Sequence, residues 1–273
     1  MKDSLPNNFD AENAARLCEA SAAAYSECLE SPGGRPEDAV VSARSTDTCV
    51  RITRTESDLV IAFRGTTDAR NWLTDLDCAW DMEDGCRIHR GFARALDSVQ
   101  GRLGGEIMAA RWEGRRVWLA GHSLGGALAM LYGWRYFNAH HELPFAGIYT
   151  FGQPRVGNSA FRLIYNSCPE LFGSTFRVVH ADDIVPRVPW LLGCYRHAGH
   201  EVFVSGAGSG RLEFRVDPSL GFKLPFDAVN AVRELRHGKV ALLADHHVAT
   251  YLELFPANIV RPGVGEDASR VCR

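Results

Sequence analysis

A Gly-x-Ser-x-Gly pentapeptide, Gly121–Gly125, is the strongest chemical signal in the sequence. It follows an apolar stretch typical of a buried strand, Val117–Ala120, and precedes a helical pattern, Leu124–Phe137. This context is typical of a nucleophile elbow, in which a serine projects from a strained strand-to-helix turn and glycines let neighbouring backbone approach. Ser123 is therefore the candidate nucleophile, and the N–H groups at the helix start could bind a developing oxyanion.

A serine nucleophile needs a base, and the base needs a carboxylate that orients it. Both residue types follow Ser123 in the chain. A strand pattern over Thr175–His180 leads into a loop with adjacent carboxylates, and two imidazoles lie near the C-terminus. The order Ser, Asp, His is the one expected for a sheet that carries a nucleophile elbow. The residues alone leave two choices open, between Asp182 and Asp183 and between His246 and His247.

Strand and helix patterns alternate through the middle of the chain. Helices are predicted over Asp10–Glu27, Phe92–Ala110, Leu124–Phe137, Ser159–Cys168, Ala228–Leu235 and His246–Leu254. Strands are predicted over Cys49–Arg54, Leu59–Arg64, Val117–Ala120, Phe145–Phe151, Thr175–His180, Glu201–Val204 and Leu212–Val216. This alternation favours an α/β fold with a largely parallel sheet. There is no internal repeat and no long linker, so we expect one domain over residues 1–273.

Composition excludes several broad classes of function. The chain has 273 residues, 46% hydrophobic and 23% charged, which is enough apolar material to bury a core. The net charge of -3 lacks the basic excess of a nucleic-acid binder, so we expect no nucleic-acid partner. The most apolar stretch, Val117–Trp134, is interrupted by glycines and polar residues, so no transmembrane segment is expected.

The cysteines give no sign of a metal centre. The eight cysteines form no Cys-x-x-Cys pair and no Cys/His pattern with zinc spacing, so we expect no metal and no cofactor. Residues 1–8 lack the apolar core of a signal peptide, which predicts a cytoplasmic chain unless a leader has been trimmed. On that interpretation most cysteines are reduced, structural thiols, whereas a secreted chain would carry disulfides.

Further blocks surround the serine, the carboxylates and the histidines in a fixed order. They are Phe63-Arg64-Gly65-Thr66, Arg70–Leu76, His89–Phe92, Gly121–Gly126, Phe151–Gly157, Asp183–Pro186, Tyr195–His197 and Asp245-His246. Over roughly residues 10–255 the chain thereby resembles the class 3 (fungal-type) lipases of the α/β-hydrolase fold. The resemblance implies a mostly parallel central sheet flanked by helices, with a short helical lid.

The resemblance also implies a role for each site residue. Ser123 is the nucleophile, Asp183 the acid and His246 the base, while the backbone N–H groups of Thr66 and Leu124 form the oxyanion hole. Asp183 is preferred to its neighbour because Ile-Val-Pro follows it directly, as in the family. His246 is preferred because its distance from the Tyr-Leu pair of the last helix suits the family better.

Two segments have more than one interpretation. Trp72, Leu73, Leu76 and Trp80 form an apolar stripe that starts soon after Thr66, as expected of a moving lid helix. The alternative is a surface helix that packs permanently on the body. The apolar run 189–192 could line an acyl-binding groove or belong to the core.

Together these features predict a serine ester hydrolase that cleaves acylglycerols or other lipids through an acyl-enzyme, similar to a triacylglycerol lipase. The substrate would be bound at a lipid–water interface, and a monomer is the default. Two alternatives share the fold, a short-chain carboxylesterase and a phospholipase. A non-catalytic lipase-like binding module is a third, although all three triad positions are filled.

Overall fold

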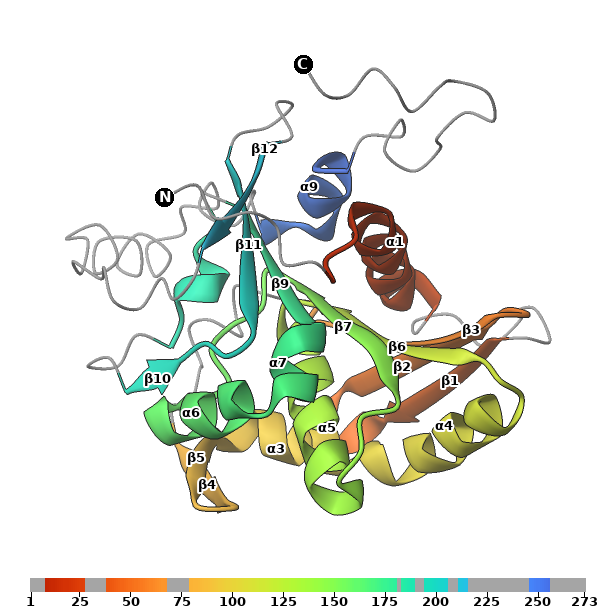
Figure 1. Ribbon diagram of the computed structural model, residues 1–273, viewed down its shortest axis with the longest axis horizontal. Coiled ribbons are helices and arrows are strands. Elements are labelled where there is room, and N and C mark those ends of the chain that lie inside the picture. The colour runs from red at the N-terminus through yellow and green to blue at the C-terminus, as the bar shows by residue number, and fades with distance from the viewer. Residues whose placement is uncertain are drawn as a thin grey trace.

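An eight-stranded sheet with the order β1-β2-β3-β6-β7-β9-β11-β12 lies at the centre of the chain. The computed structural model describes residues 8–27, 38–67, 79–180, 183–189, 194–205, 211–215 and 246–255 (Figure 1). The strands are β1 (Asp38–Ala43), β2 (Thr48–Arg54), β3 (Asp58–Phe63), β6 (Arg116–His122), β7 (Phe145–Phe151), β9 (Thr175–His180), β11 (His200–Ser205) and β12 (Arg211–Arg215). Neighbours from β3 to β11 run parallel, and the edge strands pair antiparallel. The predicted mostly parallel sheet is confirmed.

Helices cover both faces of this sheet. They are α1 (Ala11–Glu27), α3 (Arg90–Asp97), α4 (Leu103–Trp112), α5 (Leu124–His140), α6 (Ser159–Ser167), α7 (Pro169–Ser174) and α9 (Val248–Glu253). Figure 1 shows α1 and α9 on one face, with α3, α4 and α5 on the other. The side chains of β6 divide accordingly: Trp118 packs with Leu17 and Tyr251, while Leu119 packs with Trp134. Because both faces are covered, the central strands β3, β6 and β7 consist mostly of apolar residues.

The predicted helix over Phe92–Ala110 is wrong as a single element. The structure divides it into α3, a 3-10 turn over Gln100–Arg102, and α4. Gly101 lies in the 3-10 turn, and Gly104 and Gly105 lie in the first turn of α4. Glycine is a poor residue for the interior of a helix. Strand β1 was not predicted, and the predicted helix over residues 228–235 lies outside the described residues.

A second, four-stranded sheet has the order β10-β8-β5-β4 and was not predicted. Its strands are β4 (Trp80–Glu83), β5 (Cys86–His89), β8 (Gly157–Asn158) and β10 (Tyr195–Arg196). Asp84 and Gly85 join β4 to β5 with positive φ angles of 45° and 79°, as a tight hairpin turn requires. Trp80 therefore belongs to a strand, which corrects its predicted place on a lid helix. Its ring stacks on Tyr195 with centroids 3.8 Å apart.

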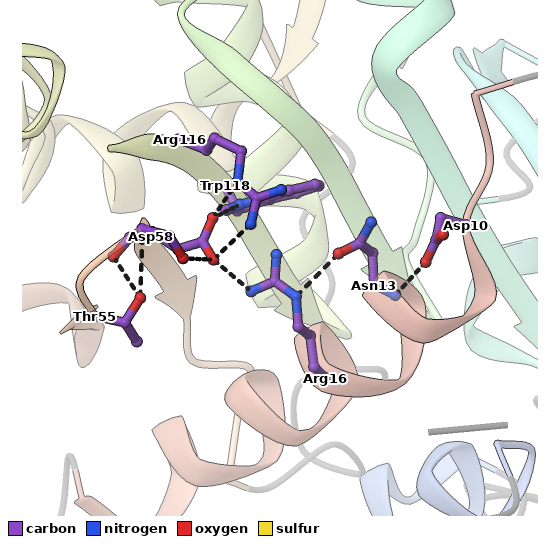
Figure 2. A network of polar contacts seen from close by, with 8 residues as sticks. Asp10, Asn13, Arg16, Thr55, Asp58, Arg116 and Trp118 are labelled. Carbon is purple, nitrogen blue, oxygen red and sulfur yellow. Dashed lines mark hydrogen bonds and ion pairs between the residues drawn. The ribbon is translucent and has the colours of Figure 1, made fainter. Parts of the chain in front are cut away.

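A network of charged side chains lies at the end of the main sheet where the interior strands β3 and β6 begin (Figure 2). Asp58 accepts hydrogen bonds from Arg116 at 2.8 and 3.0 Å and from Trp118 Nε1 at 2.7 Å. Arg16 of α1 lies 3.9 Å from the same carboxylate, and its guanidinium carbon is 4.6 Å from the centroid of the Trp118 ring. The network therefore fastens α1 to the beginnings of both strands.

The cysteines only partly follow the prediction of reduced thiols. Cys18, Cys86, Cys168 and Cys194 are free, but Cys49 is disulfide-bonded. None of the described helices is both long and apolar enough to cross a bilayer.

Candidate active site

Ser123 lies at the sharp turn between β6 and α5. Its backbone has φ 58° and ψ -129°, a conformation that non-glycine residues rarely adopt and that marks strain. The turn is possible because the flanking residues are glycines. A Cβ on Gly121 would lie 2.3 Å from the carbonyl carbon of Gly125, and a Cβ on Gly125 would lie 2.0 Å from the carbonyl oxygen of Phe63. The turn therefore has the geometry of a nucleophile elbow, pressed against the end of β3.

A continuous chain of hydrogen bonds joins the three predicted triad residues. His246 Nε2 lies 2.8 Å from Ser123 Oγ, and His246 Nδ1 lies 2.8 Å from Asp183 Oδ2. The three residues are 1–3% exposed. Because a carboxylate only accepts hydrogen bonds, Nδ1 carries the proton and Nε2 is free to accept the serine hydroxyl proton. The geometry is that of a nucleophile, a base and an orienting acid.

The carboxylate of Asp183 is held from several sides. Its Oδ1 accepts the backbone N–H of Val185 at 2.8 Å, and its Oδ2 also accepts the hydroxyl of Tyr251 at 2.6 Å. The Tyr251 oxygen in turn accepts the backbone N–H of His180 at 3.2 Å. A buried charge is tolerated only when hydrogen bonds replace its hydration, and these donors meet that need. Next to this carboxylate, burial raises the pKa of Tyr251 well above its ordinary value, so it stays a donor.

Gly152, directly after β7, leaves room for the acid–base pair. Its φ is +59°, and a Cβ there would lie 2.8 Å from Asp183 Oδ2 and 3.0 Å from His246 Cε1. Any side chain at this position would therefore displace one of the two groups. The sequence places Gly152 inside a family block, but its contact with residues far along the chain appears only in the fold.

Arg155 and His197 hold the loop that carries Asp183. The backbone N–H and Nη1 of Arg155 donate to the carbonyls of Val188 and Pro189 at 2.9 and 3.0 Å. His197 Nε2 donates to the carbonyl of Pro186 at 2.6 Å. Burial, together with the neighbouring arginines, lowers the pKa of Arg155 to about 10. Burial also lowers the pKa of His197 well below its ordinary value, so the ring is neutral and holds its proton on Nε2.

The predicted oxyanion donors lie at the end of β3 and the start of α5. Thr66 follows the strand end that packs on the elbow, and its Oγ1 is buried without a hydrogen-bond partner among the described residues. Leu124 is the first residue of α5, and the first N–H groups of a helix have no acceptor within it. Unpaired donors next to the nucleophile are what an oxyanion hole requires.

Several predicted positions fall elsewhere or cannot be placed. His247 is exposed at the N-terminus of α9, so His246 is the imidazole that contacts Ser123. Asp182, the lid residues Trp72, Leu73 and Leu76, and residues 190–192 of the suggested groove lie outside the described residues. Among the described residues, no group of three or more His, Cys, Asp or Glu side chains could hold a metal ion.

Two tyrosines that no sequence motif singles out contact the site. Tyr251 bonds Asp183, and Tyr25 of α1 bonds His122, whose ring stacks on His246. In the sequence, Tyr25 lies in the apolar stripe of the predicted helix Asp10–Glu27, where a core residue is expected. No spacing in the sequence connects it to residues about a hundred positions away.

Comparison with known proteins agrees with this geometry. Residues 60–192 match the family described as Lipase (class 3). The secreted mono- and diacylglycerol lipase 1 of Fusarium solani is 34% identical over 154 residues, which cover 55% of this chain and 44% of the relative. A lipase of Rhizomucor miehei is 31% identical over 170 residues, covering 58% of this chain and 46% of the relative. The chain thus spans about half the length of these curated relatives.

Solved structures show the same architecture. The propeptide complex of the Rhizomucor miehei lipase superposes with a TM-score of 0.67 at 26% identity, covering 75% of this chain and 71% of that one. A triacylglycerol lipase whose catalytic centre is formed by a serine protease triad superposes with a TM-score of 0.65 at 26% identity, covering 78% and 89%. The α/β-hydrolase fold and the resemblance predicted from the sequence are confirmed.

Proposed function

We propose, with the resemblance of residues 60–192 to class 3 lipases as the premise, that this chain is a serine ester hydrolase acting on acylglycerols. The observation that carries the proposal is the buried hydrogen-bond chain from Ser123 through His246 to Asp183. A serine at a strained elbow, an imidazole with its free nitrogen toward the hydroxyl, and an ionised carboxylate suit acyl transfer.

The reaction follows from the direction of these hydrogen bonds. His246 Nε2 takes the hydroxyl proton as Ser123 Oγ attacks the ester carbonyl, and Asp183 supports the imidazolium that forms. The tetrahedral oxyanion is bound by the N–H groups of Thr66 and Leu124 and by the threonine hydroxyl. His246 then protonates the leaving alcohol, and water repeats the cycle on the acyl-enzyme. No cofactor enters any step.

The substrate class rests on the relatives. Curated relatives are named as mono- and diacylglycerol lipases and as a triacylglycerol lipase, which supports a neutral lipid ester as the substrate. We expect this chain to work at a lipid–water interface, and a single-domain monomer would suffice for that, because one chain supplies all three triad side chains. A segment carrying Trp72, Leu73 and Leu76 would serve as the lid.

Two observations support a proposal for the compartment. Several relatives are described as secreted, and Cys49 is disulfide-bonded, a state that oxidising compartments favour. We therefore favour an exported enzyme over the cytoplasmic default.

Hydrolysis of p-nitrophenyl butyrate and palmitate, followed across each solubility limit, tests the function. Wild type is expected to be active, and Ser123→Ala to lose at least about 10⁴-fold in kcat. A rate increase when palmitate passes its solubility limit would support a lipase, whereas a preference for soluble butyrate would favour a carboxylesterase. A phosphonate ester should label wild type and not the variant.

If wild type and variant are equally inert and the phosphonate labels neither, the proposal fails and a non-catalytic binding module takes its place. Circular dichroism and urea unfolding of both proteins show that the loss is chemical, because removing a single hydroxyl should leave the fold intact.

A further inference from the structure

A histidine and a tyrosine lie directly behind the triad, and the reaction above uses neither. His122 precedes the nucleophile and is 3% exposed. Its ring stacks on that of His246, with centroids 4.6 Å apart and planes inclined at 30°. Its Nδ1 lies 2.8 Å from the hydroxyl oxygen of Tyr25. A path of direct contacts therefore leads from the base to helix α1.

The same hydroxyl contacts the strand end that leads to the oxyanion hole. A Cβ on Gly65 would lie 2.0 Å from the Tyr25 oxygen, 2.6 Å from the carbonyl oxygen of His122 and 3.1 Å from Ser123 Cβ. Tyr25 thus touches both the oxyanion side and the base side of the site.

The hydrogen bonds fix the proton positions. In a hydrogen bond between a phenol and a neutral imidazole, the phenol O–H is the stronger donor and the ring nitrogen the stronger acceptor. The Tyr25 hydroxyl therefore donates to His122 Nδ1, and His122 holds its own proton on Nε2. Burial and the nearby His246 lower the pKa of His122 well below its ordinary value, and burial raises the pKa of Tyr25. The titratable groups that face the His122 ring among the described residues are Tyr25 from α1, His246 and His247 before α9, and Tyr251 on α9.

A neutral ring at this place suits the reaction. His246 becomes a cation each time it takes the serine proton. An uncharged aromatic face within about 6 Å attracts a cation, whereas a second imidazolium there would repel it. The stack also limits how the base can rotate out of line with Ser123.

We propose that Tyr25 and His122 are positioning residues, which hold the base His246 in line with Ser123 and join it to the strand end at Gly65. The inference rests on the proposed ester hydrolase function. It makes helix α1, which lies outside the segment matched to class 3 lipases, a working part of the active site.

The test compares two tyrosines that each lose one buried hydrogen bond. In Tyr25→Phe we expect kcat for p-nitrophenyl butyrate to fall about tenfold, with KM within about twofold of wild type. The control is Tyr165→Phe, whose hydroxyl bonds Thr175 at 2.7 Å in the core away from the triad. It should lower stability to a similar extent and leave kcat unchanged.

Nitrogen NMR of the histidine rings gives a readout that a merely structural role would not move. The His122 signals, identified by their loss in His122→Gln, should report a neutral ring protonated on Nε2 in wild type. In Tyr25→Phe they should report a mixture of tautomers, since nothing then holds the proton of His122 in place.

Three results would overturn the inference: kcat of Tyr25→Phe within about twofold of wild type, an equal kcat loss in Tyr165→Phe, or a wild-type His122 protonated on Nδ1. The NMR measurement needs no turnover. An inert wild type whose His122 changes tautomer only in Tyr25→Phe would overturn the hydrolase function and support the pairing.

Discussion

Helix α1 and strands β3 and β6 meet in a polar network at each end, and the two networks use different kinds of groups. Where the strands begin, Asp58 pairs with Arg116 and Arg16, so opposite charges carry the contact (Figure 2). Where the strands end, the groups between α1 and the elbow are Tyr25 and His122, both uncharged and linked by one hydrogen bond.

The difference matches two tasks: the charged network stabilises the fold, and the uncharged groups lie next to the residues that carry out the reaction. The side chain of Arg116 is 58% exposed, so water shares its charge and the network tolerates small shifts. At the other end, Ser123, His246 and Asp183 are buried, and the serine backbone is strained. Because these groups are buried, each keeps its hydrogen bond in one orientation. This fixed orientation aligns the proton donor Ser123 with the proton acceptor His246.

The two aspartates give the largest expected contrast. Asp183→Asn should lower kcat about 10⁴-fold, because an amide cannot support the imidazolium or fix the tautomer of His246. Asp58→Asn should leave kcat within about twofold of wild type. Steady-state kinetics on p-nitrophenyl butyrate measures both. A comparable loss in the two variants would mean that the charged end also controls the chemistry.

Two glycines with positive φ allow the same substitution to be compared inside and outside the active site. Gly152→Ala should cost about 10³-fold in kcat, since its Cβ would push against Asp183 Oδ2 and His246. Gly199→Ala is the matched control, with φ +74° and a Cβ 2.7 Å from a Thr175 methyl group. Both variants should lose stability, which urea unfolding measures. Full activity in Gly152→Ala would contradict the close approach described here.

Thr66 tests whether the active site keeps a group that helps the reaction but does not help stability. Thr66→Val should lower kcat about 10²-fold through the loss of a hydroxyl donor to the oxyanion. Because that hydroxyl is buried without a partner among the described residues, its removal should raise the free energy of unfolding or leave it unchanged. Thr66→Ser keeps the hydroxyl and should recover most of the activity. An active Thr66→Val enzyme would remove the hydroxyl from the oxyanion hole.

The charged end should respond in stability and not in rate. Asp58→Ala leaves Trp118 Nε1 without its acceptor, and we expect the free energy of unfolding to fall by about 2 kcal/mol. Glu142→Ala is the control, because Glu142 pairs with Arg111 on the surface, where water screens both charges and the pair contributes little to stability. Urea unfolding at pH 8 compares them. Equal losses would show that the network at Asp58 is an ordinary surface ion pair.

The smallest effect concerns acid sensitivity. Burial and the nearby Arg177 lower the pKa of His200 in the fold, so the unfolded chain binds its proton first. Stability from this group is full above the unfolded pKa of about 6.5 and is lost as the pH falls below it. His200→Phe, whose ring can pack on Phe172 and Phe176, should lose less stability between pH 8 and pH 5 than wild type. An unchanged pH dependence would contradict the shift.

The sequence by itself determined what depends on neighbours along the chain. Period-two and helical patterns, with the glycines around Ser123, were enough to predict the parallel strands and the elbow, because those features follow from local backbone sterics. The matching order of motif blocks identified the lipase-like family. The same local signals failed at the second sheet, whose strands β8 and β10 are two residues long and pair only with distant segments.

Only the tertiary structure decided which groups meet. His246 bonds Asp183 and Ser123, which lie 63 and 123 positions away in the chain, and sequence spacing does not show that these groups meet. The same holds for Tyr25 and Tyr251, which look like ordinary apolar-face residues of their helices. The physical reason is that hydrogen bonds between residues far apart in the chain depend on packing to within a few tenths of an ångström, and local propensity carries no such information.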